Sequence, residues 1–391
     1  MRNFKKIISV LLVLVMCMIA FAGCGSSSDN GSSDTAKGSD DAFKIGGTGP
    51  LTGAAAIYGT AAKNGATIAV EEVNALGGIQ LELNYQDDTH DAEKAVNAYN
   101  TLKDWGMQIS LGSVTSKPCE ATSAYNYSDR IFALTPSASS QAVIEGKDNV
   151  FQMCFMDPNQ GSASAQYISE QNLATKVAII WKNDDVYSKG IHETFCEKAK
   201  EVGIEVVSDM TFADGNDQDF SVQLQDAQSK GAELVFLPMY YQPASLILAK
   251  ANSMGYEPKF FGVDGMDGIL TMEGFDASLA EGVMLLTPFN ADADDEKTQS
   301  FVTKYKEEFG ETPNQFAADG YDCIYAIYQA LTNANATVDM DAQTLNDLLI
   351  EQFTTMTFDG LTGESMTWDE TGAVDKTPKG MVIKNGAYVG M

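Results

Sequence analysis

The stretch GGTGPLTGAAAIYG, residues 46–59, follows a short apolar run near the start of the chain. Glycine-rich loops that join a strand to a helix often cradle a phosphate group. Here the third glycine of a dinucleotide fingerprint is missing after Gly47 and Gly49, and Pro50 lacks the backbone N–H that a phosphate oxygen needs. The stretch therefore argues against a nucleotide site. It predicts a strand followed by a tight turn that brings Tyr58 to the carboxyl end of that strand.

Beyond this loop, short β-branched runs alternate with longer amphipathic runs. Such alternation predicts an α/β fold, with parallel sheets covered by helices on both faces. The strand candidates are 44–47, 81–86, 108–112, 131–135, 177–181, 204–210, 234–237, 259–262 and 282–287. The helix candidates are 91–105, with Asp91 as its predicted N-cap, 118–129, 160–171, 188–202, 219–230, 243–254, 295–309, 315–333 and 341–351.

The alternation pauses at residues 155–161 and again at 287–296, which divides the chain into two lobes. A length of 391 residues also suits two domains. We expect residues 43–156 and 287–374 to form lobe 1, and residues 157–286 and 375–391 to form lobe 2. The chain then crosses between the lobes more than once, so the hinge has several strands.

The N-terminus has the pattern of a lipoprotein signal peptide, residues 1–23. Arg2, Lys5 and Lys6 precede an apolar run at 7–22, and small residues directly precede Cys24. Cys24 is therefore the predicted lipidated first residue of the mature chain, and residues 24–42 are too polar to order themselves and form a tether. This predicts a protein anchored through lipid to the outer face of the cell membrane, as in Gram-positive bacteria. A plain transmembrane anchor is the alternative.

Charge and motif content exclude several functions. A net charge of −29 repels phosphate backbones, so nucleic-acid binding is not expected. Neither His90 nor His192 has a second histidine in ligand spacing, which disfavours zinc sites and histidine catalysis. The acidic run 290–296 has Asp295 where a calcium loop needs glycine, and is expected to be a solvated loop with helix-capping acids. The sequence thus predicts no metal, no cofactor and no enzyme activity. It favours free thiols at Cys119, Cys154, Cys196 and Cys323, with disulfides, which an export signal permits, as the alternative.

Small ligands of open parallel sheets bind just beyond the carboxyl ends of the strands. In the first lobe, Ser116 followed by Pro118 has the pattern of a helix N-cap, where free N–H groups favour a carboxylate, and Ser139 adds a hydroxyl. The second lobe offers aromatic side chains and one acid: Tyr187, Tyr240 or Tyr241, and Asp264. A carboxylate subsite that faces an acidic subsite suits a zwitterion.

Residues 43–391 resemble the substrate-binding proteins of branched-chain amino-acid ABC transporters, the leucine/isoleucine/valine-binding family with the type I periplasmic-binding fold. The resemblance rests on IGGTGPLTGAAAIYG (45–59), AVEEVNALGGI (69–79), YQDDTHDAEKAV (85–96), GSVTS (112–116), LTPSASS (134–140), FMDPNQG (155–161), VYSKG (186–190), FLPMYYQPA (236–244), GVDGMDG (262–268) and MTWDETGAV (366–374). It implies two Rossmann-like lobes joined by a multi-stranded hinge.

The resemblance also implies roles for individual residues. Ser116 and Ser139 would hold the carboxylate of an amino acid, with backbone groups near Ser137. Asp264 would hold the ammonium group, and Tyr187 and Tyr240 would close over the ligand. The ligand's side chain would be approached by Tyr58, Val114 and Thr115.

Two departures from the family pattern concern the pocket for the ligand's side chain. Well-known leucine-binding members carry Glu where Asp264 stands, and Asp is one methylene shorter. Some members also have a disulfide at the places that hold His90 and Thr115 here.

The sequence thus predicts a monomeric, extracytoplasmic lipoprotein that captures a small amino acid and delivers it to an ABC permease and, through it, to the ATPase subunits. The alternatives are a receptor for a non-amino-acid solute such as an amide or urea-like compound, a ligand-sensing domain, and a surface enzyme.

Overall fold

A computed structural model describes residues 41–391 of the chain. The predicted signal peptide, Cys24 and nearly all of the tether lie outside the described residues. Within the described part, no helix has both the length and the apolar character needed to cross a membrane.

The first sheet is parallel and has the strand order β2-β1-β3-β4-β5. Its strands are β1 (Phe43–Gly49), β2 (Leu81–Asp87), β3 (Ile109–Leu111), β4 (Ala133–Thr135) and β5 (Val150–Gln152). The glycines of β1 serve close packing, because a Cβ on Gly47 would lie 2.5 Å from the Tyr85 ring of the neighbouring strand. A Cβ on Gly49 would lie 2.6 Å from the Tyr85 hydroxyl.

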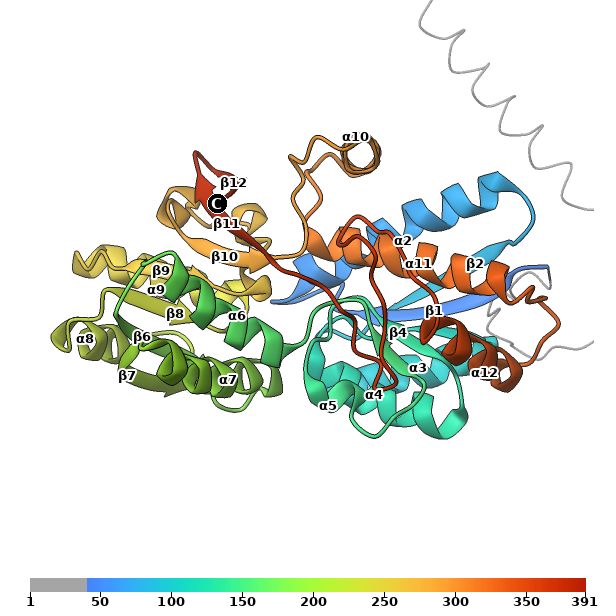
Figure 1. The fold of residues 1–391 in the computed structure, drawn as a ribbon, viewed down its shortest axis with the longest axis horizontal. Coiled ribbons are helices and arrows are strands. Elements are labelled where there is room, and N and C mark those ends of the chain that lie inside the picture. Colours follow the sequence, from blue (N-terminus) through green and yellow to red (C-terminus); the bar gives the residue numbers. More distant parts are fainter. Residues whose placement is uncertain (1–40) are drawn as a thin grey trace, which may run out of the picture. The chain divides into compact units, whose positions relative to one another are not determined.

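Helices cover both faces of the first sheet (Figure 1). On one face lie α2 (Ala56–Leu76) and α11 (Gln315–Asn333), and on the other α3 (Ala92–Trp105), α4 (Ser116–Asp129) and the short α5 (Gln141–Ile144). The same lobe also holds α10 (Glu296–Phe309) and α12 (Ala342–Phe353). The backbones of α2 and α11 touch, since a Cβ on Gly65 would lie 1.8 Å from the carbonyl oxygen of Ala317.

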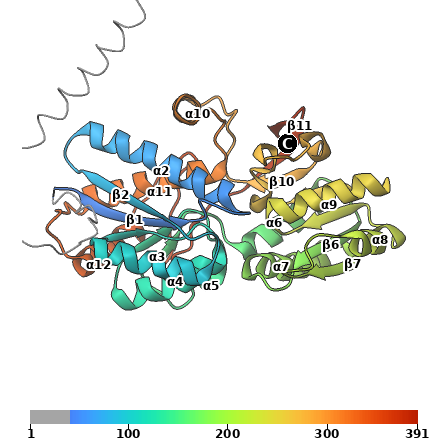
Figure 2. The ribbon, with the colours of Figure 1, turned by 180° about the vertical axis from the view of Figure 1, so that it is seen from behind.

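The second sheet has the order β12-β11-β10-β9-β8-β6-β7. Its strands are β6 (Lys176–Lys182), β7 (Glu205–Phe212), β8 (Leu234–Leu237), β9 (Lys259–Gly262), β10 (Met284–Thr287), β11 (Lys379–Lys384) and β12 (Ala387–Gly390). Alternate residues of β6 face opposite layers. Val177 and Ile179 pack with α6 (Asp157–Glu170) and α7 (Val186–Val202), while Ala178 and Ile180 pack with α8 (Ser221–Ser229) and α9 (Tyr241–Met254). Figure 2 shows the same layers from behind.

The hinge consists of three crossings between the sheets, after β5, after β10 and before β11. A buried ion pair holds the last crossing to the first lobe. The Lys376 ammonium lies 3.2 Å from an Asp319 carboxyl oxygen on α11 and donates a hydrogen bond to Thr362. Both charged side chains are almost fully buried, at 0% and 2% exposure. Burial raises the pKa of Asp319 to about 7, although the Lys376 ammonium opposes that rise.

The structure confirms the predicted two-lobed α/β class and places the predicted strands and helices within about three residues of their expected ends. It corrects three expectations. The sheets are not wholly parallel, because β11 and β12 pair antiparallel at the edge of the second sheet. The list of helical runs lacked α2, of which only the end at 69–79 was recognised, through the family resemblance, and the list of strands lacked β5, β11 and β12.

Candidate functional site

A pocket with about 230 Å³ of empty volume lies at the carboxyl ends of the strands, between the two sheets. Most of this space is too narrow for a water molecule, and there is room for about one. The two lobes therefore meet across the pocket and nearly close it. The lining comprises Tyr58, Val114, Thr115, Ser116, Ser137, Tyr187, Tyr240, Asp264, Gly265 and Phe316.

Seven of the eight predicted ligand-binding residues line this pocket, and Ser139 does not. Ser139 is buried behind it, and its backbone carbonyl accepts a hydrogen bond from the Asp157 N–H at 2.9 Å. The structure thus brings residues from both lobes to one place.

The first lobe presents the start of α4 to the pocket. The N-cap of α4 is Thr115, and Ser116 is its first helical residue, so the prediction that Ser116 is the N-cap is wrong by one position. The Ser116 hydroxyl instead accepts a hydrogen bond from the N–H of Ser140 at 3.2 Å. The first N–H groups of a helix have no carbonyl partner within it, and they carry the positive end of the helix dipole. This end of the pocket therefore favours an anion.

The second lobe presents the Asp264 carboxyl, which follows β9 and is 4% exposed. Tyr187 donates a hydrogen bond to its Oδ1 at 2.6 Å, and the Gly265 N–H donates to the same oxygen at 2.8 Å. Burial raises the pKa of Asp264 to about 6, although these hydrogen bonds lower it. No lysine or arginine is among the residues that line the pocket with it.

A second buried carboxyl, Asp157, lies beside Asp264 at the start of α6. Neither of its carboxyl oxygens has a hydrogen-bond partner of standard geometry in the described part of the chain, and the same holds for the Ser139 hydroxyl and the Gln160 amide nitrogen. Burial raises the pKa of Asp157 well above its ordinary value, while the Ser139 hydroxyl opposes the rise and Asp264 adds to it. Unpaired buried polar groups are costly, so this cluster points to a ligand.

Sequence reasoning missed Asp157 and Phe316. Asp157 stands in FMDPNQG, where an acid before proline is also the ordinary pattern of a helix start. Phe316 belongs to the predicted helix 315–333, but only the fold brings the start of that helix to the pocket.

Tyr58 joins the two lobes. Its hydroxyl donates to the Gly265 carbonyl at 2.5 Å and accepts from the Tyr241 N–H at 3.0 Å, both in the second lobe. Its ring lies 4.6 Å from the Phe316 ring, centroid to centroid. The second lobe adds Tyr240, which stacks on Tyr187 with centroids 4.6 Å apart. The pocket therefore has an aromatic wall between its two polar ends.

The rim of this wall is polar. The His90 Nδ1 lies 2.9 Å from the Thr115 hydroxyl oxygen, and the His90 ring meets Tyr240 edge-on. Burial lowers the pKa of His90 to about 4, so the ring is neutral near pH 7.

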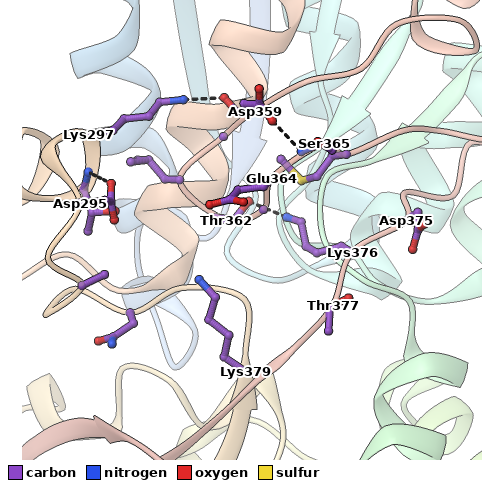
Figure 3. Close-up of a pocket in the computed structure, with 17 residues that line it drawn as sticks. Asp295, Lys297, Asp359, Thr362, Glu364, Ser365, Asp375, Lys376, Thr377 and Lys379 are labelled. Atoms are coloured by element: carbon purple, nitrogen blue, oxygen red, sulfur yellow. Dashed lines mark hydrogen bonds between the residues drawn. The ribbon is translucent and has the colours of Figure 1, made fainter.

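A larger hollow with about 1630 Å³ of empty volume lies beside the hinge (Figure 3). Two of its lysines have partners: Lys297 donates to the Asp359 carbonyl at 2.5 Å, and Lys376 is paired with Asp319. Among the described residues that line it, none has a buried polar side-chain atom without a partner. The smaller pocket between the lobes is therefore the better candidate site.

The sequence model of a family described as periplasmic binding protein matches residues 42–386. This chain belongs to that family. A relative is the leucine-, isoleucine-, valine-, threonine- and alanine-binding protein of Pseudomonas aeruginosa, which is 25% identical over 299 residues, or 75% of this chain and 79% of that protein.

Solved structures of the family have the same fold. A leucine-binding protein from Thermotoga maritima aligns with a TM-score of 0.80 at 26% identity, over 89% of this chain and 97% of that one. The branched-chain amino acid transporter substrate-binding protein of Streptococcus pneumoniae, in complex with isoleucine, aligns with a TM-score of 0.80 at 28% identity, over 90% of this chain and 100% of that one. These matches confirm the family resemblance expected from the sequence.

Proposed function

We propose that this chain captures a small amino acid, branched-chain or similar, between its two lobes and delivers it to the permease of an ABC transporter. One observation carries the proposal: the buried Asp264 carboxyl, with no lysine or arginine among the residues that line the pocket, shares that pocket with the start of α4. A zwitterion offers its ammonium group to the carboxyl and its carboxylate to the start of the helix. The relatives from Pseudomonas aeruginosa and Streptococcus pneumoniae, which are amino-acid-binding proteins, support the same substrate class.

The carboxylate of the ligand lies at the start of α4 in this proposal. The backbone N–H groups there and the hydroxyls of Ser116 and Thr115 act as donors, with Ser137 and its backbone beside them. Ser139 supports this end from behind the lining. Charge-assisted hydrogen bonds of this kind are about twice as strong as neutral ones.

The ammonium group lies between Asp264 and Asp157, and Tyr187 and Tyr240 cover it. An ammonium has three donors and no acceptor, so it matches carboxyl oxygens that lack partners. Asp157 extends the predicted set, because a second carboxyl compensates for the shorter reach of Asp264 compared with Glu.

The ligand's side chain lies against Tyr58, Val114 and Phe316. Their rings and methyl groups suit an apolar side chain, and the small volume of the closed pocket favours a small one. The proposal also includes the lobe boundaries. Lobe 1 consists of residues 43–156 and 287–374, and lobe 2 of residues 157–286 and 375–391, so that both lobes contribute ligand contacts.

The remaining parts of the proposal concern the setting. Cys24 carries a lipid that holds a monomeric receptor at the outer face of the membrane, and the partners are an ABC permease and its ATPase subunits. The chain binds without catalysis, so ligand recovered from the complex is chemically unchanged. The named relatives are binding proteins, which supports this reading.

The substrate class is tested by a thermal-shift screen of the twenty amino acids and simple amides, because a bound ligand raises the melting temperature by mass action. The best amino acid is then compared with its amide and its deaminated acid. We expect both relatives to bind at least tenfold more weakly, since each leaves one polar end of the pocket unpaired. An amide that binds as well as the amino acid would favour the alternative receptor.

The site is tested by Asp264→Ala and isothermal titration calorimetry. Loss of the carboxyl leaves the ammonium without its main partner, which we expect to weaken binding by about 2–5 kcal/mol. Asp276→Ala is the matched control, because Asp276 is an exposed acid of the same lobe that caps the 3-10 turn Ala277–Ala280 outside the pocket. An unchanged dissociation constant in Asp264→Ala would contradict the assignment.

A further inference from the structure

A cluster of metal-binding side chains lies in the second lobe, outside the pocket. His192 and Cys196 stand four residues apart on one face of α7, and Asp209 lies opposite them on β7. The ligand atoms of these three side chains all lie within 4.8 Å of one another. The sequence search looked for a second histidine and therefore passed over it.

The three side chains converge on one atom. The Nε2 of His192 lies 3.0 Å from each carboxyl oxygen of Asp209 and 3.4 Å from the Cys196 sulfur. A single imidazole proton does not serve three such atoms at once. The ligand atoms of a tetrahedral zinc ion lie roughly 3.3–3.6 Å apart, given bonds of about 2.0–2.3 Å. The observed separations therefore need only small shifts to surround an ion.

Trp181 on β6 holds two of the three groups in place. Its ring stacks on the His192 ring with centroids 4.1 Å apart, and its indole N–H donates to Asp209 at 2.8 Å. Outer partners of this kind fix the orientation of metal ligands. The His192 side chain is 12% exposed and the Asp209 side chain 45% exposed, so one side of the cluster is open to solvent.

We propose that His192, Cys196 and Asp209 bind a divalent cation of the zinc class, with water as the fourth ligand. The ion accepts the imidazole Nε2 lone pair, a carboxyl oxygen and the thiolate, and the Cys196 thiol releases its proton to solvent as the sulfur–metal bond forms. Binding links β7, the edge strand of the second sheet, to α7. No step depends on the amino-acid site.

The test uses the full chain and two probes, Co²⁺ for spectroscopy and Zn²⁺ for competition. We expect one Co²⁺ per chain, with visible bands of tetrahedral intensity and a near-ultraviolet band from thiolate-to-metal charge transfer, and we expect Zn²⁺ to abolish both. Cys196→Ser should remove the charge-transfer band and weaken Zn²⁺ binding at least tenfold. A Co²⁺ complex without that band, or a Cys196→Ser variant with unchanged Zn²⁺ affinity, would overturn the proposal.

Matched variants distinguish metal binding at the cluster from a general attraction of cations to the acidic surface. Asp209→Asn and Glu193→Gln each remove one carboxylate, but Glu193 pairs with Lys189 on the surface of α7 and lies outside the cluster. We expect only Asp209→Asn to weaken Zn²⁺ binding, again by at least tenfold. Equal loss in both variants would mean diffuse attraction to an acidic surface and would overturn the site.

The other cysteines of the described chain do not compete for the metal. Cys119, Cys154 and Cys323 are free but buried, so they offer no open thiol. Cys196→Ser also separates Cys196 from every other thiol of the chain.

Discussion

At the residue scale, the proposed function needs an ionised Asp264, but the ligand-free fold favours its neutral form. The folded chain binds the Asp264 proton more tightly than the unfolded chain does, because burial raises the pKa from 3.8 to about 6. Ionisation of Asp264 therefore destabilises the ligand-free fold as the pH rises from about 4 to about 6. An ammonium placed against the ionised carboxyl reverses this cost. Binding and stability thus make opposite demands on the same side chain.

The raised pKa predicts a pH dependence for amino-acid binding. Asp264 must be ionised to hold the ammonium, so its protonation should have little effect on the dissociation constant above pH 7. Below pH 6 it should rise by up to about tenfold per pH unit, as the free protein takes up a proton. Titration calorimetry at pH 8, 7, 6 and 5 measures the slope. His90 has a pKa of about 4 and stays neutral across that range.

A neighbouring acid provides the control for this pH profile. Burial also raises the pKa of Asp185 to about 6, but Asp185 caps α7 by accepting from the Tyr187 N–H and does not line the pocket. Asp185→Asn keeps a capping side chain, so the profile should persist in this variant. If the pH dependence disappears in Asp185→Asn, Asp185 and not Asp264 causes it, and the prediction is wrong.

At the element scale, α2 and α11 form the core of the first lobe through small residues. Gly65 and Ala62 of α2 meet Ala317 and Gly320 of α11 with backbones in contact. The two backbones approach closely and few large side chains interlock between them, which explains why the periodicity of the sequence did not reveal α2. A helix whose buried residues are mostly alanine and glycine has a weak apolar stripe.

This packing predicts the effect of one added methyl group. In Gly65→Ala the new Cβ would lie 1.8 Å from the Ala317 carbonyl oxygen, so the helices must separate. Although alanine is the better helix former, overpacking should lower the free energy of unfolding by about 1–3 kcal/mol or more. Urea unfolding followed by circular dichroism measures the change. Gly390→Ala is the control, because nothing lies within 4 Å of its Cβ position. Equal stability of the two variants would refute the close contact.

The elements that the sequence predicted correctly are those with local signals. Strands such as Leu234–Leu237 and capped helices such as Ala92–Trp105, with Asp91 accepting from Lys94 N–H, carry local signals and were predicted correctly. The antiparallel pair β11–β12 was not, because its partner strand β10 lies about ninety residues earlier in the chain and pairing is not a local property.

The candidate site shows the same limit. Positions that directly follow strands, such as Asp264, could be listed from the sequence because parallel strands end at one edge. Phe316 and Asp157 begin helices, and only the packing of those helices brings Phe316 to the pocket and Asp157 close to Asp264. Cys196 and Asp209 are likewise joined by tertiary structure, since β7 must lie beside α7 for the cluster to form.

At the scale of the whole molecule, the described arrangement is a closed one, with room for about one water molecule in the pocket. An amino acid therefore enters only when the lobes part. Closure is a shift between two populations, and it is favoured by any contact made only when the lobes meet. Tyr58 makes such contacts without the ligand, through Gly265 and Tyr241 of the second lobe. Tyr241 adds another, because its hydroxyl donates to the Ala54 carbonyl at 2.6 Å.

Tyr58→Phe should weaken ligand binding because it removes contacts of the closed state while keeping the aromatic wall. The lost hydroxyl leaves a buried carbonyl and a buried N–H without partners, at a cost of about 1–3 kcal/mol, or roughly fivefold to over one hundredfold in the dissociation constant. Calorimetry measures the affinity, and small-angle X-ray scattering with and without ligand measures closure. Tyr256→Phe is the matched control, since its hydroxyl donates to the Ala232 carbonyl inside the second lobe. That variant should lose stability and keep its affinity. If both variants lose affinity equally, Tyr58 acts through general stability, and the hydrogen bonds between the lobes do not drive closure.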